Sequence, residues 1–202
     1  AEYDKVGNFY NGAAWVVKNK QYGLINNKGE LTIDCQYESV SDCYNNKVVW
    51  LEKNGKYALS DQKGHLLTDF VYIDYSGFVE NVAWVKNDES LFGLINGKGE
   101  ILLQPRYIKV MPFYNNVAAV FSKAGQIGLV NTQGKEIART VYAGSSQRFG
   151  VSQFKTSTKI FSYLTHPQLG NSWIDQDGKV IARGVKIVYK ITDVIPDALW
   201  DF

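Results

Sequence analysis

The sequence predicts an all-β repeat protein, and two observations carry this prediction. The 202 residues include 18 Gly, 13 Tyr, 10 Phe and 5 Trp but only 4 Pro and 1 Met, a composition typical of short strands joined by tight turns. A period of 35 residues also organises the chain, and a repeat of this length needs stacked neighbours to bury its core. We therefore expect about five three-stranded antiparallel meander units in one curved array.

Five columns of residues recur at this spacing over four consecutive units, without an insertion. An open, solenoid-like array is favoured because the units near the C-terminus are irregular. The alternative is a closed, propeller-like array, in which the partial units at the two termini pair with each other. The columns are Gly29, Gly64, Gly99 and Gly134; Tyr37, Tyr72, Tyr107 and Tyr142; Leu24, Leu59, Leu94 and Leu129; Gly23, Ala58, Gly93 and Gly128; and Ala13, Val48, Ala83 and Ala118.

The first unit shows how each strand is predicted. Residues 13–17 (AAWVV) are apolar and β-prone, residues 22–26 (YGLIN) form the second strand, and residues 31–33 (LTI) begin the third. Residues 37–40 (YESV) lead into the next unit. The turn between the second and third strands opens with Asn or Asp and closes with Gly in each unit, which predicts a type I turn followed by a left-handed glycine. The opening residues are Asn26, Asp61, Asn96 and Asn131.

A second kind of glycine lies inside the predicted strands. Gly23, Gly93 and Gly128 stand where glycine weakens a ladder, so we expect a bulge or the close approach of another backbone there. The aromatic residues near them and the Tyr37 column are expected to stack between neighbouring units.

Runs of residues in the first and third units resemble the bacterial WG-repeat family, and the match covers residues 6–142 well and the remainder loosely. The runs are 12–16 (GAAWV), 22–30 (YGLINNKGE) and 37–40 (YESV) in the first unit, and 82–85 (VAWV), 92–96 (FGLIN) and 105–107 (PRY) in the third. Tyr22 and Phe92 stand where the family often has Trp, and Ala58 replaces the following Gly in the second unit. The resemblance implies a β-repeat scaffold without catalytic residues, of a kind found in secreted, envelope and toxin-neutralising bacterial proteins.

We expect a single domain over residues 1–202, with regular repeats at 6–145 and a degenerate C-terminal repeat and cap at 146–202. A fifth unit is recognisable at residues 173–179 (WIDQDGK), but its Gly178 follows Gly134 by 44 residues rather than 35. The nine extra residues lie within residues 155–171. Such insertions often map to a binding face, although a hairpin that caps the open edge of the array is the favoured interpretation and is compatible with binding. The candidate binding residues are Lys159, Phe161, Tyr163 and His166.

The chain lacks the residue patterns of enzymes, cofactor sites and metal sites. It contains no nucleophile elbow, phosphate loop or metalloprotease motif, so we expect no catalytic residues, no metal and no cofactor. The net charge of +2 argues against a nucleic-acid partner, and no apolar stretch is long enough to span a bilayer. The turn-tip lysines, Lys28, Lys63 and Lys98, are interpreted as solvated residues, with an anionic ligand as the alternative.

Cys35 and Cys43 leave two interpretations open. They lie eight residues apart in one inter-unit connection, so a disulfide would close a small loop there in an exported protein. Cys43 also takes the column of Phe78 and Phe113, and buried free thiols behave as small hydrophobic side chains.

The function predicted from the sequence is binding. The chain opens at Ala1 and its only methionine is Met111, so we expect a removed signal peptide and a periplasmic or secreted protein; a trimmed chain would instead be cytoplasmic. The first hypothesis is a non-enzymatic, exported bacterial protein-binding module, namely an immunity protein that neutralises a toxin by direct binding. The alternative is a module that binds cell-envelope glycan or peptidoglycan, motivated by the 14% of aromatic residues.

Overall fold

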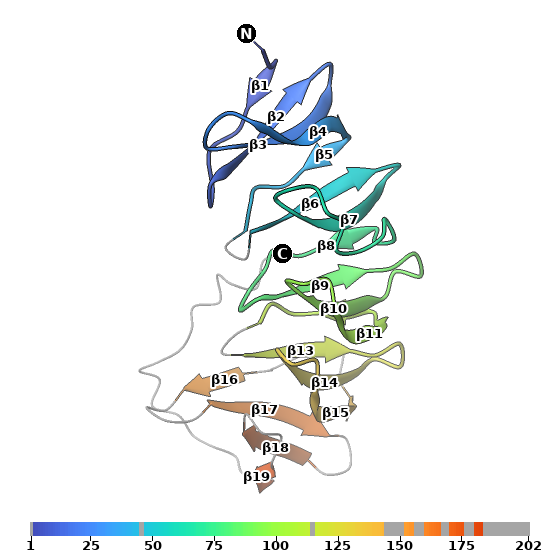
Figure 1. The fold of residues 1–202 in the computed structure, drawn as a ribbon. Helices are drawn as coiled ribbons and strands as arrows, with labels where there is room; N and C mark the ends of the chain where they lie inside the picture. The colour runs from blue at the N-terminus through green and yellow to red at the C-terminus, as the bar shows by residue number, and fades with distance from the viewer. Residues whose placement is uncertain are drawn as a thin grey trace.

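The computed structural model describes residues 2–44, 47–113, 116–143, 152–155, 160–166, 170–175 and 180–183. All of its regular elements are β-strands, which form five antiparallel sheets. The sheets are stacked one after another in an elongated column that begins at the N-terminus (Figure 1). Within the described residues no sheet closes on itself, and the first and last sheets lie at opposite ends of the column, so the described part of the array is open (Figure 1). The prediction of an all-β repeat array is thus confirmed.

Each sheet is a meander whose strands follow the chain order. Units 1 to 4 are built by β1–β4, β5–β7, β8–β11 and β12–β15, and β16–β19 form the fifth sheet. The strands are β1 (Lys5–Val6), β2 (Ala13–Lys18), β3 (Gln21–Asn26), β4 (Leu31–Tyr37), β5 (Ser39–Val40), β6 (Val48–Lys53), β7 (Lys56–Asp61), β8 (Asp74–Tyr75), β9 (Val82–Lys86), β10 (Phe92–Asn96), β11 (Ile101–Tyr107), β12 (Lys109–Val110), β13 (Val117–Phe121), β14 (Gln126–Asn131), β15 (Glu136–Ala143), β16 (Ser152–Lys155), β17 (Ile160–His166), β18 (Gly170–Asp175) and β19 (Val180–Arg183).

The prediction of three strands per unit misses one short strand. The residues that lead into each unit form a two-residue strand, which pairs with the first long strand of that unit. These entry strands are β1, β5, β8 and β12. Two residues are too few to show an alternating pattern in the sequence, and their position is set by pairing with the neighbouring strand.

The register of the first long strand corrects one of the predicted columns. Trp15 lies opposite Leu24 and Trp50 opposite Leu59, and Trp84, one residue short of the 35-residue spacing, lies opposite Leu94. The column that begins with Ala13 therefore continues as Val48, Val82 and Val117, and not through Ala83 and Ala118. The turn between the first and second long strands is one residue longer in units 3 and 4 than in units 1 and 2. The segment that leads to the first long strand is one residue shorter in units 3 and 4 than in unit 2.

Hydrophobic residues are buried between successive units, as the stacking argument predicts. One cluster joins units 1 and 2 through Leu24, Ile33 and Leu51, and another joins units 3 and 4 through Trp84 and Val120. Of the tyrosine column, Tyr37, Tyr72 and Tyr107 are all buried. The side chain of Tyr142 lies outside the described part of the structure.

The glycines inside the strands lie at bulges, where the third strand passes very close. A β-carbon at Gly93 would lie 2.7 Å from the carbonyl oxygen of Leu103 and 2.8 Å from the nitrogen of Pro105. A β-carbon at Gly23 would lie 2.5 Å from the carbonyl oxygen of Ile33. The register of β3–β4, β10–β11 and β14–β15 shifts at this point of each pairing.

Unit 2 has Ala58 at this position and lacks a continuous third strand. Two isolated bridges, Tyr57 with Tyr72 and Ser60 with Leu66, connect β7 to the segment that follows it, and the Leu59 carbonyl accepts a hydrogen bond of 2.8 Å from the Leu67 N–H. Between the bridges the Thr68 Oγ1 accepts a hydrogen bond of 2.8 Å from the backbone N–H of Leu59. The β-carbon of Ala58, which is fully buried, occupies the space through which the third strand passes in the other units.

The turn glycines have positive φ, from 75° at Gly134 to 86° at Gly64. The opening Asn or Asp accepts hydrogen bonds from two backbone N–H groups; Asn96 Oδ1, for example, accepts from Lys98 at 2.9 Å and Glu100 at 3.0 Å. A β-carbon at Gly99 or Gly134 would also collide with a carbonyl of the preceding unit, that of Leu67 or Leu102. Each of these turns therefore rests on the backbone of the unit before it.

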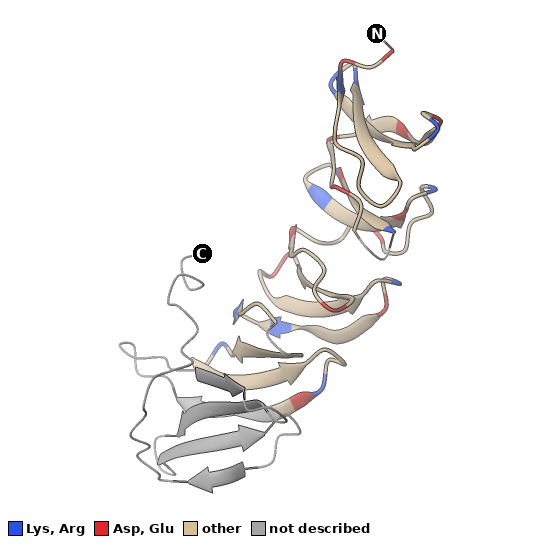
Figure 2. Ribbon diagram, turned by 90° about the vertical axis from the view of Figure 1, so that its left-hand side faces the viewer, with Lys and Arg blue, Asp and Glu red and all other residues tan. Residues whose placement is uncertain are grey.

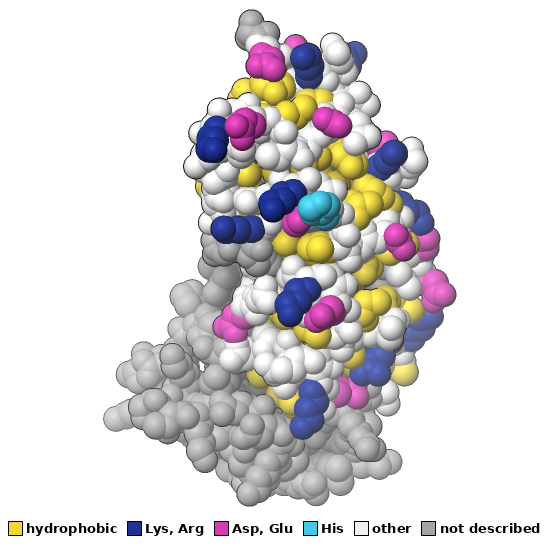
Figure 3. Space-filling view, viewed as in Figure 1, with side chains coloured by type: hydrophobic (Ala, Val, Ile, Leu, Met, Phe, Trp, Pro, Cys, Tyr) yellow, Lys and Arg dark blue, Asp and Glu magenta, His cyan; other side chains and the backbone are white. Residues whose placement is uncertain are grey.

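In the described part of the chain, charged residues lie mainly at the turns and strand ends (Figure 2). Over the face seen in Figure 3, basic and acidic side chains alternate with hydrophobic ones. The turn-tip residues Lys28, Lys63 and Lys98 are all exposed.

Candidate functional site

Two hollows lie along one edge of the column, which we call the entry edge. It is formed by the entry strands and the turns that join them to the first long strands, in the described residues 4–12, 38–44, 73–81 and 108–113. The first hollow, the polar cleft, has a volume of about 540 Å³ and crosses units 1 to 3. The second, the apolar groove, has a volume of about 480 Å³ and lies between units 3 and 4. Phe78 lines both, so the two hollows are neighbours along this edge.

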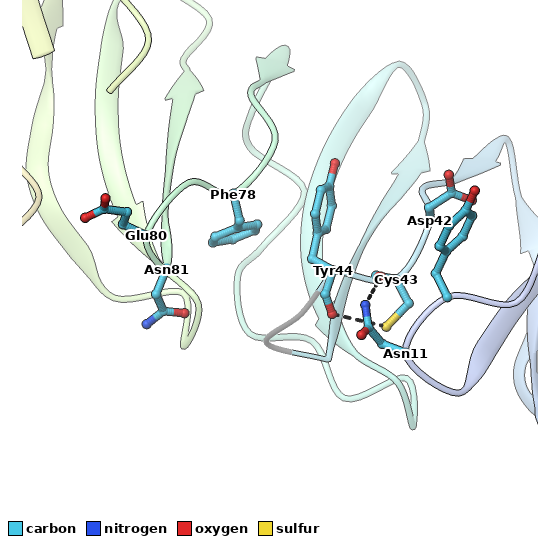
Figure 4. Close-up of a pocket in the computed structure, with 8 residues that line it drawn as sticks. Asn11, Asp42, Cys43, Tyr44, Phe78, Glu80 and Asn81 are labelled. Atoms are coloured by element: carbon cyan, nitrogen blue, oxygen red, sulfur yellow. Dashed lines mark hydrogen bonds between the residues drawn. The ribbon is translucent and has the colours of Figure 1, made fainter. Parts of the chain in front are cut away.

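The polar cleft is built by three equivalent turns, one from each of units 1, 2 and 3. Its lining residues are Tyr10, Asn11, Asp42, Cys43, Tyr44, Phe78, Glu80 and Asn81 (Figure 4). Asn11, Glu80 and Asn81 have positive φ, which asparagine tolerates well. The Asn11 side chain donates a 2.8 Å hydrogen bond to the carbonyl of Cys43, and the Gln62 amide donates to the backbone oxygen of Asn11 at 2.9 Å. These bonds hold the unit 1 turn against unit 2.

The polar cleft combines negative charge with aromatic rings. Asp42 and Glu80 are exposed, and none of the described residues that line the cleft is basic. In the amide orientation that satisfies its hydrogen bonds, Asn116 donates to the Glu80 carboxylate. Tyr10 is 46% exposed, so its ring is available to a ligand. Carboxylates beside aromatic faces favour a cationic group such as a lysine or arginine side chain.

Burial raises the pKa of two further groups that line the cleft, Tyr44 and Cys43. Burial raises the pKa of Tyr44, and the nearby Asp42 carboxylate raises it further, while a hydrogen bond with Ser41 opposes both. Burial likewise raises the pKa of the Cys43 thiol, against a hydrogen bond from Gln62 and the charge of Lys47. The Gln62 amide nitrogen lies 2.8 Å from the Cys43 sulfur. The charge of the cleft lining is therefore carried by Asp42 and Glu80.

The apolar groove is lined mainly by hydrophobic and aromatic side chains. Its floor includes Trp84, whose ring stacks on Phe113 at a centroid distance of 5.1 Å and an interplanar angle of 12°. The Trp84 Nε1–H donates to the carbonyl of Met111 at 3.1 Å, which fixes the ring. Val110 and Phe92 contribute further walls.

The structure does not describe the side chains of the binding residues predicted in the C-terminal insertion. Lys159 lies outside the described residues. Phe161, Tyr163 and His166 belong to β17, a strand that pairs with β18 throughout and with β16 over its first half. The structure thus describes a paired strand in this segment, and the contacts of these side chains lie outside what it describes.

Cys35 and Cys43 are both free thiols in the structure. Cys43 is buried in the cluster that joins units 1 and 2, whereas Cys35 is half-buried beside Ala14 and Val16. Cys43 thus has the environment of a buried free thiol, whereas Cys35 is free and only half-buried.

Among the described residues, no set of three or more His, Cys, Asp and Glu side chains is placed to hold a metal ion. None of the elements in that part of the chain is a helix long and apolar enough to cross a membrane. His65 lies at an exposed turn with its Nδ1 2.8 Å from Asp61.

The entry edge was missed from the sequence, although a signal for it exists. Tyr followed by Asn occurs just before the first strand of three units, at residues 10–11, 44–46 and 114–116. Two of these tyrosines, Tyr10 and Tyr44, line the polar cleft. The apolar groove has no comparable sequence signal. Its presence depends on which side chain fills the space between two stacked units.

Comparison with solved structures finds only distant similarity. The computationally designed Ika8 protein has 12% identity and a TM-score of 0.42 over 88% of this chain and 61% of that one. Hsv2p of Kluyveromyces lactis has 11% identity and a TM-score of 0.41 over 94% and 66%, and BamB of Moraxella catarrhalis has 10% and 0.37 over 87% and 61%. The chain spans less than two thirds of the length of each.

No curated protein matches the sequence significantly. A family model described as "WG containing repeat" matches residues 1–22, 22–57, 59–89 and 92–122. The first match lies within unit 1, and each of the other three runs from one stacked unit into the next; together they cover more than half of the chain. The chain therefore belongs to the WG-repeat family.

Proposed function

We propose that this protein is a non-enzymatic, exported binding module whose partner is a protein that docks along the entry edge. The observation that carries the proposal is that the polar cleft and the apolar groove are neighbours, with Phe78 lining both. Together they offer a surface with an acidic, aromatic part and an apolar part, a combination typical of protein interfaces. Stacked repeats present such a surface on a rigid scaffold, which lowers the entropic cost of binding.

The partner class that we propose is a bacterial toxin, which the protein would neutralise as an immunity protein by covering it. The acidic lining of the cleft favours a partner that presents lysine or arginine side chains. The first experiment is co-expression with the product of the neighbouring reading frame. We expect a stable complex and protection of the host cell. The absence of both binding and protection for that product would contradict the toxin assignment.

Isosteric variants test whether the partner docks on this edge. The double variant Asp42→Asn and Glu80→Gln removes both charges of the cleft and preserves its shape. We expect the dissociation constant measured by calorimetry to rise about 10-fold or more, since interface charge pairs are worth about 1.4 kcal/mol or more. Glu89→Gln, an exposed carboxylate in the β9–β10 hairpin, is the matched control. Equal affinities of the two variants would contradict docking at the cleft.

A second candidate function, binding to a cell-envelope glycan, is favoured by one observation. The exposed ring of Tyr10 lies beside the amide of Asn11 and the carboxylates of the cleft, and sugars are bound by such mixtures of aromatic and polar side chains. Retention on purified peptidoglycan that is lost in Tyr10→Ala would support this candidate. The protein-binding proposal predicts no retention.

A further inference from the structure

The apolar groove has a filled counterpart one unit earlier in the column. At the boundary between units 2 and 3, the entry residue Tyr75 stacks on Trp50 at a centroid distance of 4.5 Å and an angle of 20°. The same ring lies edge-on to Tyr57 at 4.9 Å and 73°. Tyr75 is therefore held between the aromatic residues of two strands.

Strand pairing identifies the equivalent residues at the boundary between units 3 and 4. Tyr75 pairs with Val85 of β9, and Val110 pairs with Val120 of β13, so Val110 takes the place of Tyr75. Trp84 likewise takes the place of Trp50, and Phe92 that of Tyr57. The aromatic walls are retained, but the side chain between them is a valine. The groove of about 480 Å³ lies at this boundary, lined by Trp84, Phe92 and Val110.

The charges around the two boundaries also differ. At the filled boundary, Glu52 and Asp74 lie near the Tyr75 hydroxyl, and both carboxylates add to the effect of burial in raising its pKa. Pairing places Lys86 where Glu52 stands one unit earlier, and Lys109 where Asp74 stands. Lys109 lines the groove, and the Lys86 ammonium lies 5.2 Å from the centroid of Phe92. The rim of the open groove is thus more basic than that of the filled boundary, with Asp74 as its one lining carboxylate.

We infer that the groove between units 3 and 4 is a receptor for one aromatic side chain of the partner protein, with a carboxylate next to it. The aromatic ring would lie against Phe92 as Tyr75 lies against Tyr57, beside the stacked pair of Trp84 and Phe113, and the carboxylate would face Lys109. The internal tyrosine one unit earlier shows the chemistry of the occupant, and the basic rim selects the acidic neighbour. This inference rests on the proposed function, because it names the chemistry of the partner at the same edge.

Small aromatic probes test the groove without the partner. Met111 lines the groove and is the only methionine of the sequence, so its labelled methyl group gives a single NMR signal that an aromatic ring in the groove would shift. We expect saturable shifts with N-acetylphenylalanine amide, with a dissociation constant on the order of 1 mM, and at least about 5-fold weaker binding of N-acetylleucine amide. N-acetylphenylalanine, with its free carboxylate, should bind about 2- to 3-fold more tightly than the amide at low salt, and this gain should vanish at high salt.

Variants at equivalent positions provide matched controls. Val110→Tyr fills the groove as Tyr75 does and should abolish the shift, whereas Val6→Tyr makes the same change on the exposed entry strand β1 and should leave binding unchanged. Should Val110→Tyr fail to fold, Lys109→Glu, at an exposed position, decides: it should reverse the preference for the carboxylate probe. An unchanged preference in Lys109→Glu, binding that persists in a folded Val110→Tyr, or no saturable shift in the natural protein would overturn the inference.

The two proposals fail in different ways. Loss of probe binding in a protein that still binds its partner would overturn the aromatic receptor and leave the proposed function standing. Probe binding by a protein that binds no partner protein would overturn the proposed function and leave the aromatic receptor standing.

Discussion

Units 2 and 3 differ at the glycine position of the second long strand, which is Ala58 in unit 2 and Gly93 in unit 3, and the course of the third strand differs as well. In unit 3, Gly93 lets β11 pass so close that a β-carbon would meet the backbone of Leu103 and Pro105. In unit 2, Ala58 carries that β-carbon, and the following segment pairs at two isolated bridges. The hydrogen bond from the Leu59 N–H to Thr68 Oγ1 satisfies part of the backbone there. The repeat thus tolerates loss of a strand where a side chain satisfies the freed backbone group.

The largest loss of stability is expected when Gly93 of unit 3 is replaced by alanine, the residue that unit 2 has at this position. Gly93→Ala should lower the free energy of unfolding by about 3 kcal/mol, because the added methyl group collides with rigid backbone rather than with a movable side chain. Urea denaturation followed by circular dichroism measures this loss. Gly125→Ala, at a positive φ with open space around it, is the control and should cost only about 1 kcal/mol.

The reverse exchange completes this test. Ala58→Gly should cost no more than about 1 kcal/mol, from backbone entropy and the lost methyl group. A Gly93→Ala protein as stable as Gly125→Ala would contradict the role assigned to this column.

The next largest effect concerns the turn glycines. Gly99→Ala should cost about 2–3 kcal/mol, because positive φ and the contact with the Leu67 carbonyl both oppose a side chain. Gly29→Ala should cost only about 1 kcal/mol, since the same φ is present but nothing lies within 4 Å. Thermal or urea denaturation of the two variants gives the difference directly. Equal losses would show that the contact between units adds nothing.

A smaller effect is expected at Thr68. Thr68→Val removes the acceptor of the Leu59 N–H and should cost about 1–2 kcal/mol, the penalty of an unsatisfied, part-buried donor. Thr32→Val is the matched change in unit 1, where the hydroxyl only donates to Leu24 O at 3.3 Å. We expect the Thr32 variant to lose less than half as much stability in the same urea titration. The reverse order would show that the Thr68 hydroxyl does not replace a strand contact.

The smallest effect is a difference in acid sensitivity between equivalent turns. Burial alone would raise the pKa of the Asp61 carboxyl, but hydrogen bonds from the His65 ring and from the backbone N–H groups of His65 and Lys63 outweigh burial and lower it. A lowered pKa in the folded state means that this carboxylate stabilises the fold above about pH 4 and that its contribution is lost as the pH falls further.

Asp61→Asn should therefore flatten the decline of the urea midpoint between pH 6 and 2.5, and Asn96→Asp should steepen it. The asparagine turns of units 1, 3 and 4 have no carboxyl at this position. Identical pH profiles for the natural protein and both variants would refute the assignment.

Residues that recur in the sequence predicted the fold well. The Asn–Gly turns, the strands around Leu24 and the burial of Tyr37 between units all follow from the 35-residue period. The first-strand column was misaligned because Val82 and Ala83 are both small and apolar, so spacing alone could not choose between them. Pairing with β10 decides the register.

The candidate site was less predictable than the fold. The polar cleft joins residues 10 to 81 of three units, and its Tyr–Asn signal is short. The groove depends on the difference between Tyr75 and Val110, which has a meaning only once each is known to lie between two stacked units. The sequence predicted the binding residues in the segment that interrupts the repeat, residues 155–171. The entry edge lies within the regular units.

The turn glycines that contact the preceding unit favour folding of the units in order from the N-terminus. Gly99 and Gly134 each lie against the third-strand segment of the unit before them, so that segment must be in place before the next turn can settle. A ribosome releases the N-terminal unit first, and each later unit then finds a finished template as it emerges. The same dependence links neighbouring units, because a disturbance of the backbone at Leu67 or Leu102 reaches the turn of the following unit.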